Sequence, residues 1–145
     1  MMPSKSDWIL LALRKTPLDR IRLMKTLFLV WYRSGQNIPQ YFEFEPYLYG
    51  PCSLEVYSVL EDLSKLRLIV QAPHPVQQWA NYYLTERGRA IAEDVAKNIE
   101  PKMRKLVEQV ALEVSQLGFY ELLRKVYSEA PEFAVNSLVR EVIQR

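Results

Sequence analysis

The segment over residues 54–89 decides the fold prediction, and it reads LEVYSVLEDLSKLRLIVQAPHPVQQWANYYLTERGR. Apolar residues recur at helical spacing over 54–66, which predicts a helix with Ser53 as its N-cap. Residues 68–72 (LIVQA) and 79–84 (WANYYL) have the composition of strands, and a tip with two prolines separates them. A helix followed by a β-hairpin is therefore expected. The predicted buried stripe of the helix consists of Val56, Tyr57, Leu60 and Leu63.

Two helices are expected upstream. Residues 6–15 (SDWILLALRK) form the first, with Ser6 or Ser4 as its N-cap. Thr16 caps the second and Pro17 occupies its first position, and the helix ends at Gly35. The second helix is apolar on two faces, which places it centrally in the core. Those faces consist of Ile21, Met24, Phe28 and Trp31 on one side and Leu23, Leu27 and Val30 on the other.

Residues 41–49 (YFEFEPYLY) alternate at first, which predicts a short strand stopped by Pro46 and followed by a turn at YGPCS (49–53). Downstream, Thr85 caps a helix over 86–99, and Pro101 begins another that covers 102–117 and ends at Gly118. Two shorter helical stretches follow, at 119–129 and at roughly 132–144.

This order of elements predicts a mostly helical α+β fold. A helix pair followed by a two-stranded wing is the plan of the winged helix-turn-helix, which places its later helix in the major groove of DNA. LEDLSKLRLI (60–69) and YLTERGR (83–89) also resemble the segment that many bacterial winged-helix regulators share. We expect a winged-helix domain over 1–98. Extra C-terminal helices over 99–145 either pack on this domain or form a dimer seam, and we expect a homodimer.

Composition excludes several kinds of chemistry. The chain has 145 residues with one cysteine and one histidine, too few for a disulfide framework or a zinc site built from Cys and His. Its four glycines form no phosphate-binding loop. Cys52, His74 and the Glu43–Glu45 pair have ordinary structural interpretations as a packed thiol, a solvated loop residue and a solvent-facing strand edge. We therefore expect no catalytic site, no metal and no cofactor.

The longest apolar runs have six residues, whereas a membrane span needs about 20. The first residues, MMPSKSDW, do not have the apolar region of a secretory signal. A lone cysteine suits a reducing compartment. These features predict a cytoplasmic protein without membrane contact.

A second resemblance bears on function. FEFEPYLYGPCSLEVY (42–57), preceded by KTLF (25–28), resembles the signature of the Panacea (SocA-like) antitoxin domain and its small YwgA-like relatives. LLRKVYSEAPEF (122–133) and Ser137 resemble the C-terminal part of those proteins. The chain departs from the pattern at Thr26 and Cys52. The resemblance implies an antitoxin, or an adaptor that presents a toxin to a protease.

The leading functional prediction is a non-enzymatic DNA-binding transcriptional regulator. Helix 54–66 faces the groove in this interpretation. Its candidate DNA contacts are Arg20, Arg22, Lys25, Ser53, Ser58, Lys65, Gln77 and Gln78. Charge argues against it, because phosphate contacts need Lys or Arg. The formal net charge of +2 combines seven bases against two acids in residues 1–40 with two bases against five acids in residues 41–70.

The alternative is an antitoxin or adaptor that binds a partner protein through the aromatic strand and the Tyr-Gly-Pro turn. Five of the aromatic residues lie within residues 41–49, and an exposed aromatic patch is typical of a protein interface. The candidate partner-binding residues are Tyr41, Tyr47, Tyr49, Gly50 and Pro51. The sequence leaves open whether DNA or a protein is the partner.

Overall fold

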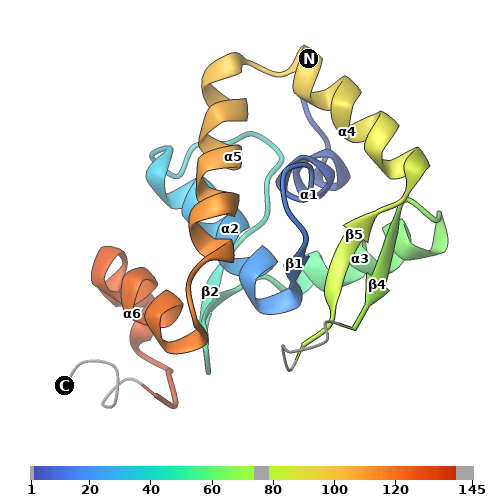
Figure 1. Ribbon diagram of the computed structural model, residues 1–145. Coiled ribbons are helices and arrows are strands. Elements are labelled where there is room, and N and C mark those ends of the chain that lie inside the picture. Colours follow the sequence, from blue (N-terminus) through green and yellow to red (C-terminus); the bar gives the residue numbers. More distant parts are fainter. Residues whose placement is uncertain (1, 74–78, 140–145) are drawn as a thin grey trace.

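The computed structural model describes residues 2–73 and 79–139, and within them the fold is mostly helical α+β (Figure 1). The helices are α1 (Lys5–Ala12), α2 (Arg20–Arg33), α3 (Leu54–Lys65), α4 (Glu86–Asn98), α5 (Pro101–Ser115) and α6 (Phe119–Glu129), and the 3₁₀ helix η1 (Pro131–Ala134) follows. The strands are β1 (Leu18–Asp19), β2 (Glu45–Tyr47), β3 (Gly50–Cys52), β4 (Ile69–Ala72) and β5 (Asn81–Leu84). No helix within the described ranges is both long enough and apolar enough to cross a bilayer.

Helix α2 is the centre of the core, as its two apolar faces predicted. All of its residues from Arg22 to Val30 are buried, and α1, α5 and β3 pack against it. The apolar stripe of α5 packs on α1 and α2 of the same chain (Figure 1). That stripe therefore has contacts within the chain. Its buried residues are Val107, Val110, Ala111 and Val114.

Strands β1, β5 and β4 form a three-stranded antiparallel sheet in that order. The β4–β5 hairpin that the sequence predicted is confirmed, and the strands pair from Ile69 with Leu84 to Ala72 with Asn81. Thr85 caps α4 as predicted, because its side-chain oxygen accepts a hydrogen bond from the backbone N–H of Gly88. Its hydroxyl also donates to the carbonyl of Arg67 at the end of α3, which joins the two helices across the hairpin.

The predicted start of the second helix was wrong. Thr16 and Pro17 precede β1, and α2 begins at Arg20 with Asp19 as its N-cap. Leu18 and Asp19 are extended because they pair with Tyr82 and Asn81 of β5. The first helix begins as predicted after Ser4, but it ends at Ala12 and not at Lys15.

The aromatic segment also differs from the prediction. Residues 41–44 are not a strand, and Pro46 lies inside strand β2 and does not stop it. Pro46 and Pro51 are register partners in a hairpin of β2 and β3 that turns at residues 48 and 49. Alternation would place Tyr41 on the opposite face from Phe42 and Phe44. All three side chains are instead buried in the same core.

Three smaller corrections concern the second half of the chain and α3. Gly118 is the N-cap of α6, and α5 ends at Ser115. The helix predicted over 132–144 is limited in the described part to η1, since residues 135–139 are not helical, and 140–145 lie outside the described residues. Tyr57, assigned to the buried stripe of α3, is exposed.

Candidate protein-binding face

Five apolar side chains lie exposed together where the β2–β3 hairpin meets the start of α3. We call this set, Tyr47, Leu48, Tyr49, Leu54 and Tyr57, the apolar face. All five line one groove with a volume of about 240 Å³. Leu54 is 59% exposed, whereas Val56, Leu60 and Leu63 of the same helix are buried in the core. Clustered exposed apolar side chains of this kind mark interaction surfaces more often than isolated ones do.

The C-terminal part of the chain holds the hairpin that presents the apolar face. The backbone N–H of Leu138 donates to the carbonyl of Leu48, and the side-chain amide of Asn136 donates to the carbonyl of Pro46. Gly50 adopts a φ of 91°, and a Cβ at that position would lie 3.2 Å from the ring of Tyr127. The turn is therefore fixed by the C-terminal part of the chain before any partner binds.

Lys25 forms part of the floor of the groove. Its side chain is only 4% exposed, and its ammonium donates a hydrogen bond to the carbonyl of Pro51. Burial lowers the pKa of Lys25 to about 8. Burial also raises the pKa of Tyr57, to about 12, and the hydroxyl of Tyr57 lies 3.8 Å from the thiol of Cys52. The floor beneath the apolar face is thus compact and offers few free polar groups.

The exposed side of α3 is acidic. It carries Glu55, Glu61 and Asp62, while Lys65 forms an ion pair with Glu61. Glu55 forms an ion pair with Lys5 at the start of α1. At the other edge, the guanidinium of Arg20 lies over the ring of Tyr57 at 5.1 Å from its centroid. An apolar centre is therefore bordered on the α3 side by carboxylates.

Three of the predicted DNA contacts are buried. Arg22 is buried, pairs with Asp19 and donates to the carbonyl of Leu117. Lys25 is buried as described above. Ser53 is buried as well, and its backbone N–H lies 3.4 Å from the sulfur of Met24. None of the three can reach a DNA phosphate in this structure.

The remaining DNA candidates divide into two sets. Arg20, Ser58 and Lys65 are exposed. Gln77 and Gln78 lie outside the described residues. The surface that the sequence assigned to DNA therefore keeps two basic side chains, and one of these is paired with Glu61.

The partner-binding candidates are also divided. Tyr47 and Tyr49 are exposed as expected. Tyr41 is buried, and its hydroxyl donates to the carbonyl of Leu27 at 2.7 Å, so it is a core residue and cannot contact a partner. Gly50 and Pro51 are buried and shape the turn without presenting a side chain.

Three residues of the apolar face were absent from the sequence candidates. Leu48, Leu54 and Tyr57 are exposed apolar residues beside Tyr47 and Tyr49. The helical stripe assigned Tyr57 to the core, because it is one residue from Val56. The sequence did contain a signal that Leu54 is exposed. Leu54 directly follows the N-cap Ser53, and the first residue of a helix need not face the core.

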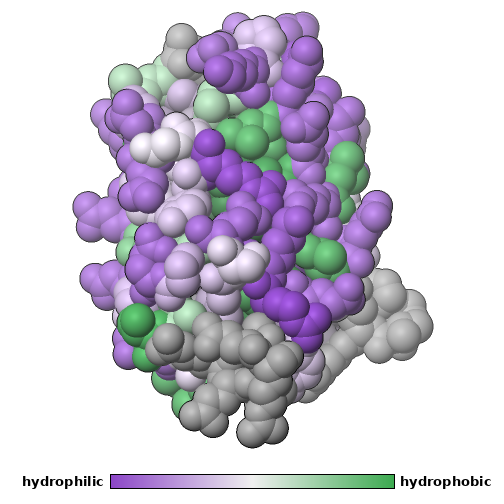
Figure 2. Space-filling model, turned by 90° about the vertical axis from the view of Figure 1, so that its left-hand side faces the viewer, coloured by the Kyte–Doolittle hydropathy of each residue, from purple (hydrophilic) through white to green (hydrophobic). Residues whose placement is uncertain are grey.

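The side of the molecule that carries α6 has a different character from the apolar face. Figure 2 shows the side that carries α6 as mostly hydrophilic, with hydrophobic surface in separate patches. Here Arg33 of α2 pairs with Glu113 of α5 and Glu129 of α6, and Lys125 also pairs with Glu113. These ion pairs lower the pKa of the Glu113 carboxyl. The charged side chains named here are therefore paired with one another within the chain.

Groups that could support catalysis or bind a metal are sparse. No cluster of three or more His, Cys, Asp or Glu side chains suits a metal ion in residues 2–73 and 79–139. Glu43 and Glu45 are exposed, and His74 lies outside the described residues. Neither a comparison with models of protein families nor one with curated proteins found a match to this chain.

Proposed function

We propose that this chain is a non-enzymatic winged-helix module that binds a protein partner through the apolar face. The arrangement of α1, β1, α2, α3 and the β4–β5 hairpin supports the winged-helix interpretation, because the hairpin follows α3 and pairs with β1, which lies between α1 and α2, in one three-stranded sheet. Winged helices also serve as scaffolds for other binding functions. The resemblance to the SocA-like antitoxin domain supports a protein as the partner.

The observation that carries the proposal is the combination of an apolar centre with an acidic border. Tyrosine side chains are enriched at the centres of protein interfaces, because they bury a large area at little cost in conformational entropy. Asp62 is the one of the three bordering carboxylates that forms no ion pair within the described residues, and Glu55 and Glu61 form exposed ion pairs with Lys5 and Lys65. Exposed ion pairs contribute little, so these carboxylates favour basic groups of a partner next to that centre. The expected partner therefore presents apolar side chains flanked by lysine or arginine, most simply on an amphipathic helix.

DNA is the second candidate, and the wing favours it. The exposed Arg20, Ser58 and Lys65 surround α3 and the hairpin in positions from which a winged helix contacts a duplex. The acidic side of α3 opposes it, because carboxylates next to the phosphate backbone lower affinity. We therefore place protein binding first.

The product of the neighbouring open reading frame is the partner to test. It is expressed alone and together with this chain in a bacterial host, and growth is measured. We expect toxicity alone and restored growth with the wild-type chain. The variant Leu54→Glu should lose the rescue, because it adds a charge to the centre of the apolar face. A neighbouring product that is tolerated alone would contradict an antitoxin role.

Leu66→Glu is the matched control. Leu66 is about as exposed as Leu54 but follows the other end of α3, outside the apolar face. It should rescue growth like the wild type, and equal rescue by Leu54→Glu would exclude the apolar face as the binding site. A labelled mixed-sequence duplex is titrated in parallel at about 50 mM salt. Binding that weakens steeply with salt and is lost in Lys65→Ala would favour DNA.

A further inference from the structure

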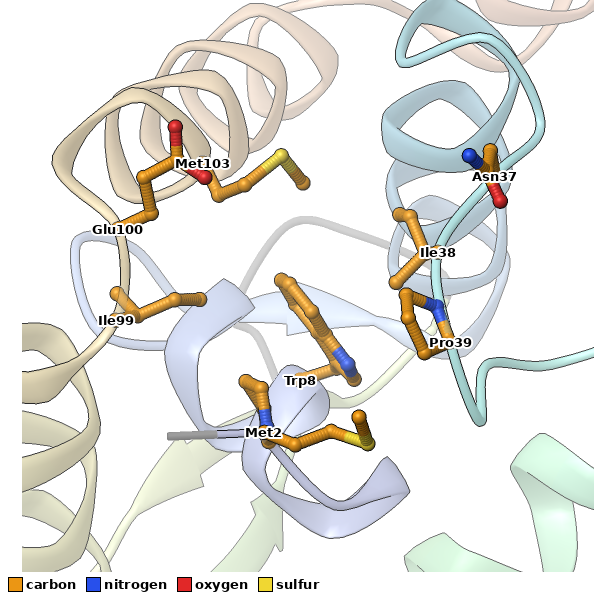
Figure 3. A pocket seen from close by; sticks show the side chains of 9 residues that line it. Met2, Trp8, Asn37, Ile38, Pro39, Ile99, Glu100 and Met103 are labelled. Carbon is orange, nitrogen blue, oxygen red and sulfur yellow. The ribbon is translucent and has the colours of Figure 1, made fainter.

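One cavity in the described part of the chain lies away from the apolar face. It opens between α1, the loop after α2 and the junction of α4 with α5, and its volume is about 510 Å³ (Figure 3). Small-molecule sites have volumes of roughly 300–1,000 Å³, so this cavity is large enough for one. Its walls are mainly apolar, with Ile38 and Pro39 on one side and Ile99 and Met103 on the other.

Trp8 supplies a directional polar group at this cavity. Its side chain is 3% exposed, and the ring lies in the middle of the view between the two walls in Figure 3. The indole nitrogen is buried and has no hydrogen-bond acceptor among the described residues. Buried donors nearly always have a partner, because losing water without a replacement is costly. An unpaired donor at an otherwise apolar cavity indicates that the acceptor is supplied by a ligand.

The charge at the cavity restricts the kind of acceptor. Glu100 lies on its rim, and the described residues that line it include no lysine or arginine. A ligand carboxylate would lie near Glu100 without a counter-charge, whereas a carbonyl oxygen accepts from an indole N–H without that repulsion. The side chain of Met2, which lines the same cavity and is 58% exposed, can move aside to admit the oxygen.

We propose that this cavity binds a neutral, mostly apolar small molecule whose carbonyl oxygen accepts a hydrogen bond from the Trp8 indole. A ketone or lactone of about a dozen heavy atoms has the required size and chemistry. The apolar body packs between Ile38 and Met103, and the oxygen lies at the nitrogen edge of the indole ring. The site is separate from the groove of the apolar face, because Trp8, Ile38, Ile99 and Met103 do not line that groove.

The test follows the indole N–H resonances of the three tryptophans by NMR on ¹⁵N-labelled protein. The probes are 4-phenylbutan-2-one, a neutral ketone, and butylbenzene, which has a similar shape without the oxygen. We expect the ketone to move the Trp8 indole resonance downfield in a saturable way and to bind about fivefold more tightly than butylbenzene. Equal affinities for the two probes, or an unmoved Trp8 resonance, would overturn the proposal.

Two variants and a control complete the experiment. Trp8→Phe should remove the preference for the ketone, while Trp79→Phe should keep it, because Trp79 packs on Phe119 and neither residue lines this cavity. Trp8→Phe can fail to fold because Trp8 also packs edge-on against Tyr41. Met103→Trp then tests whether the ketone binds in this cavity, because the larger side chain fills the cavity and leaves Trp8 in place. Undiminished ketone binding by Met103→Trp would overturn the proposal.

Discussion

The ammonium of Lys25 donates a hydrogen bond of 3.2 Å to the carbonyl oxygen of Pro51, beneath the hairpin that presents the apolar face. This contact joins the central helix α2 to strand β3 across 26 residues of sequence. It satisfies one donor of a side chain that is otherwise surrounded by protein. The lysine that the sequence assigned to phosphate binding is therefore a structural group, and its charge opposes folding.

The pH dependence of stability should show this cost. Burial lowers the pKa of Lys25 from 10.5 to about 8 in the folded state. Below pH 8 the amine is charged in both states. Between pH 8 and 10.5 the folded state has lost a proton that the unfolded chain keeps, so the free energy of unfolding rises with pH. By pH 9.5 the gain over neutral pH is about 2 kcal/mol.

Urea unfolding of the wild type and of Lys25→Met at pH 7 and pH 9.5 measures this gain. The difference between the two proteins isolates Lys25, because all other titrating groups are shared. Lys65→Met serves as the control, since Lys65 is exposed and should leave the pH dependence unchanged. Parallel pH dependence in Lys25→Met and the wild type would contradict the prediction.

Gly88 should tolerate no side chain. A Cβ at this position would lie 1.8 Å from the carbonyl oxygen of Leu68, which belongs to the backbone and cannot move aside. We expect Gly88→Ala to lower the free energy of unfolding by more than about 3 kcal/mol, or to prevent folding. Gly35→Ala is the comparison, because Gly35 has a φ of 88° with open space around it and should cost only about 1 kcal/mol. Thermal melts of both variants measure the contrast.

The hydroxyl of Thr85 should contribute more than its small size suggests. It accepts from the N–H of Gly88 and donates to the carbonyl of Arg67. Thr85→Ala removes both contacts and should cost about 1–2 kcal/mol of stability. Thr85→Ser keeps the hydroxyl and should recover most of that loss in chemical denaturation. Equal losses for the two variants would show that the methyl group, and not the cap, matters.

The buried pair of Arg22 and Asp19 should be strongly coupled. Asp19 is fully buried, and Arg22 is its ion-pair partner. Arg22→Met leaves a buried carboxylate without a counter-charge and should cost about 3–5 kcal/mol. Adding Asp19→Asn removes that charge, so the double variant should be more stable than Arg22→Met alone. A double-mutant cycle with additive losses would show that the pair is not coupled.

Local sequence signals predicted the elements whose causes are local. Three features could be predicted because each depends on residues within a few positions. They are the cap at Thr85, the start of α5 at Pro101 and the central position of α2. The β4–β5 hairpin was readable for the same reason. Strand β1 was not, since Leu18 and Asp19 are extended only because β5 lies beside them.

The candidate site was predicted only in part. Tyr47 and Tyr49 were identified, whereas Tyr41 was assigned to the surface and Tyr57 to the core, and both assignments were wrong. A tyrosine has an apolar ring and a polar hydroxyl, so the residue type alone does not decide whether it lies in the core or at the surface. The carbonyl of Leu27, which accepts the Tyr41 hydroxyl, comes from another element and could not be read from the aromatic segment.

By itself, the sequence determined the order of helices α1 to α6, the cap of α4 at Thr85, the β4–β5 hairpin and the acidic composition of α3. Only the tertiary structure decided which charged and aromatic groups remain available to a partner. Arg22 and Lys25 have the same charge as Arg20 and belong to the same helix. Asp19, the N-cap of this helix, is a local partner of Arg22. The carbonyls of Leu117 and Pro51, which accept from Arg22 and Lys25, come from other elements, and such long-range pairing follows from packing and not from the local sequence.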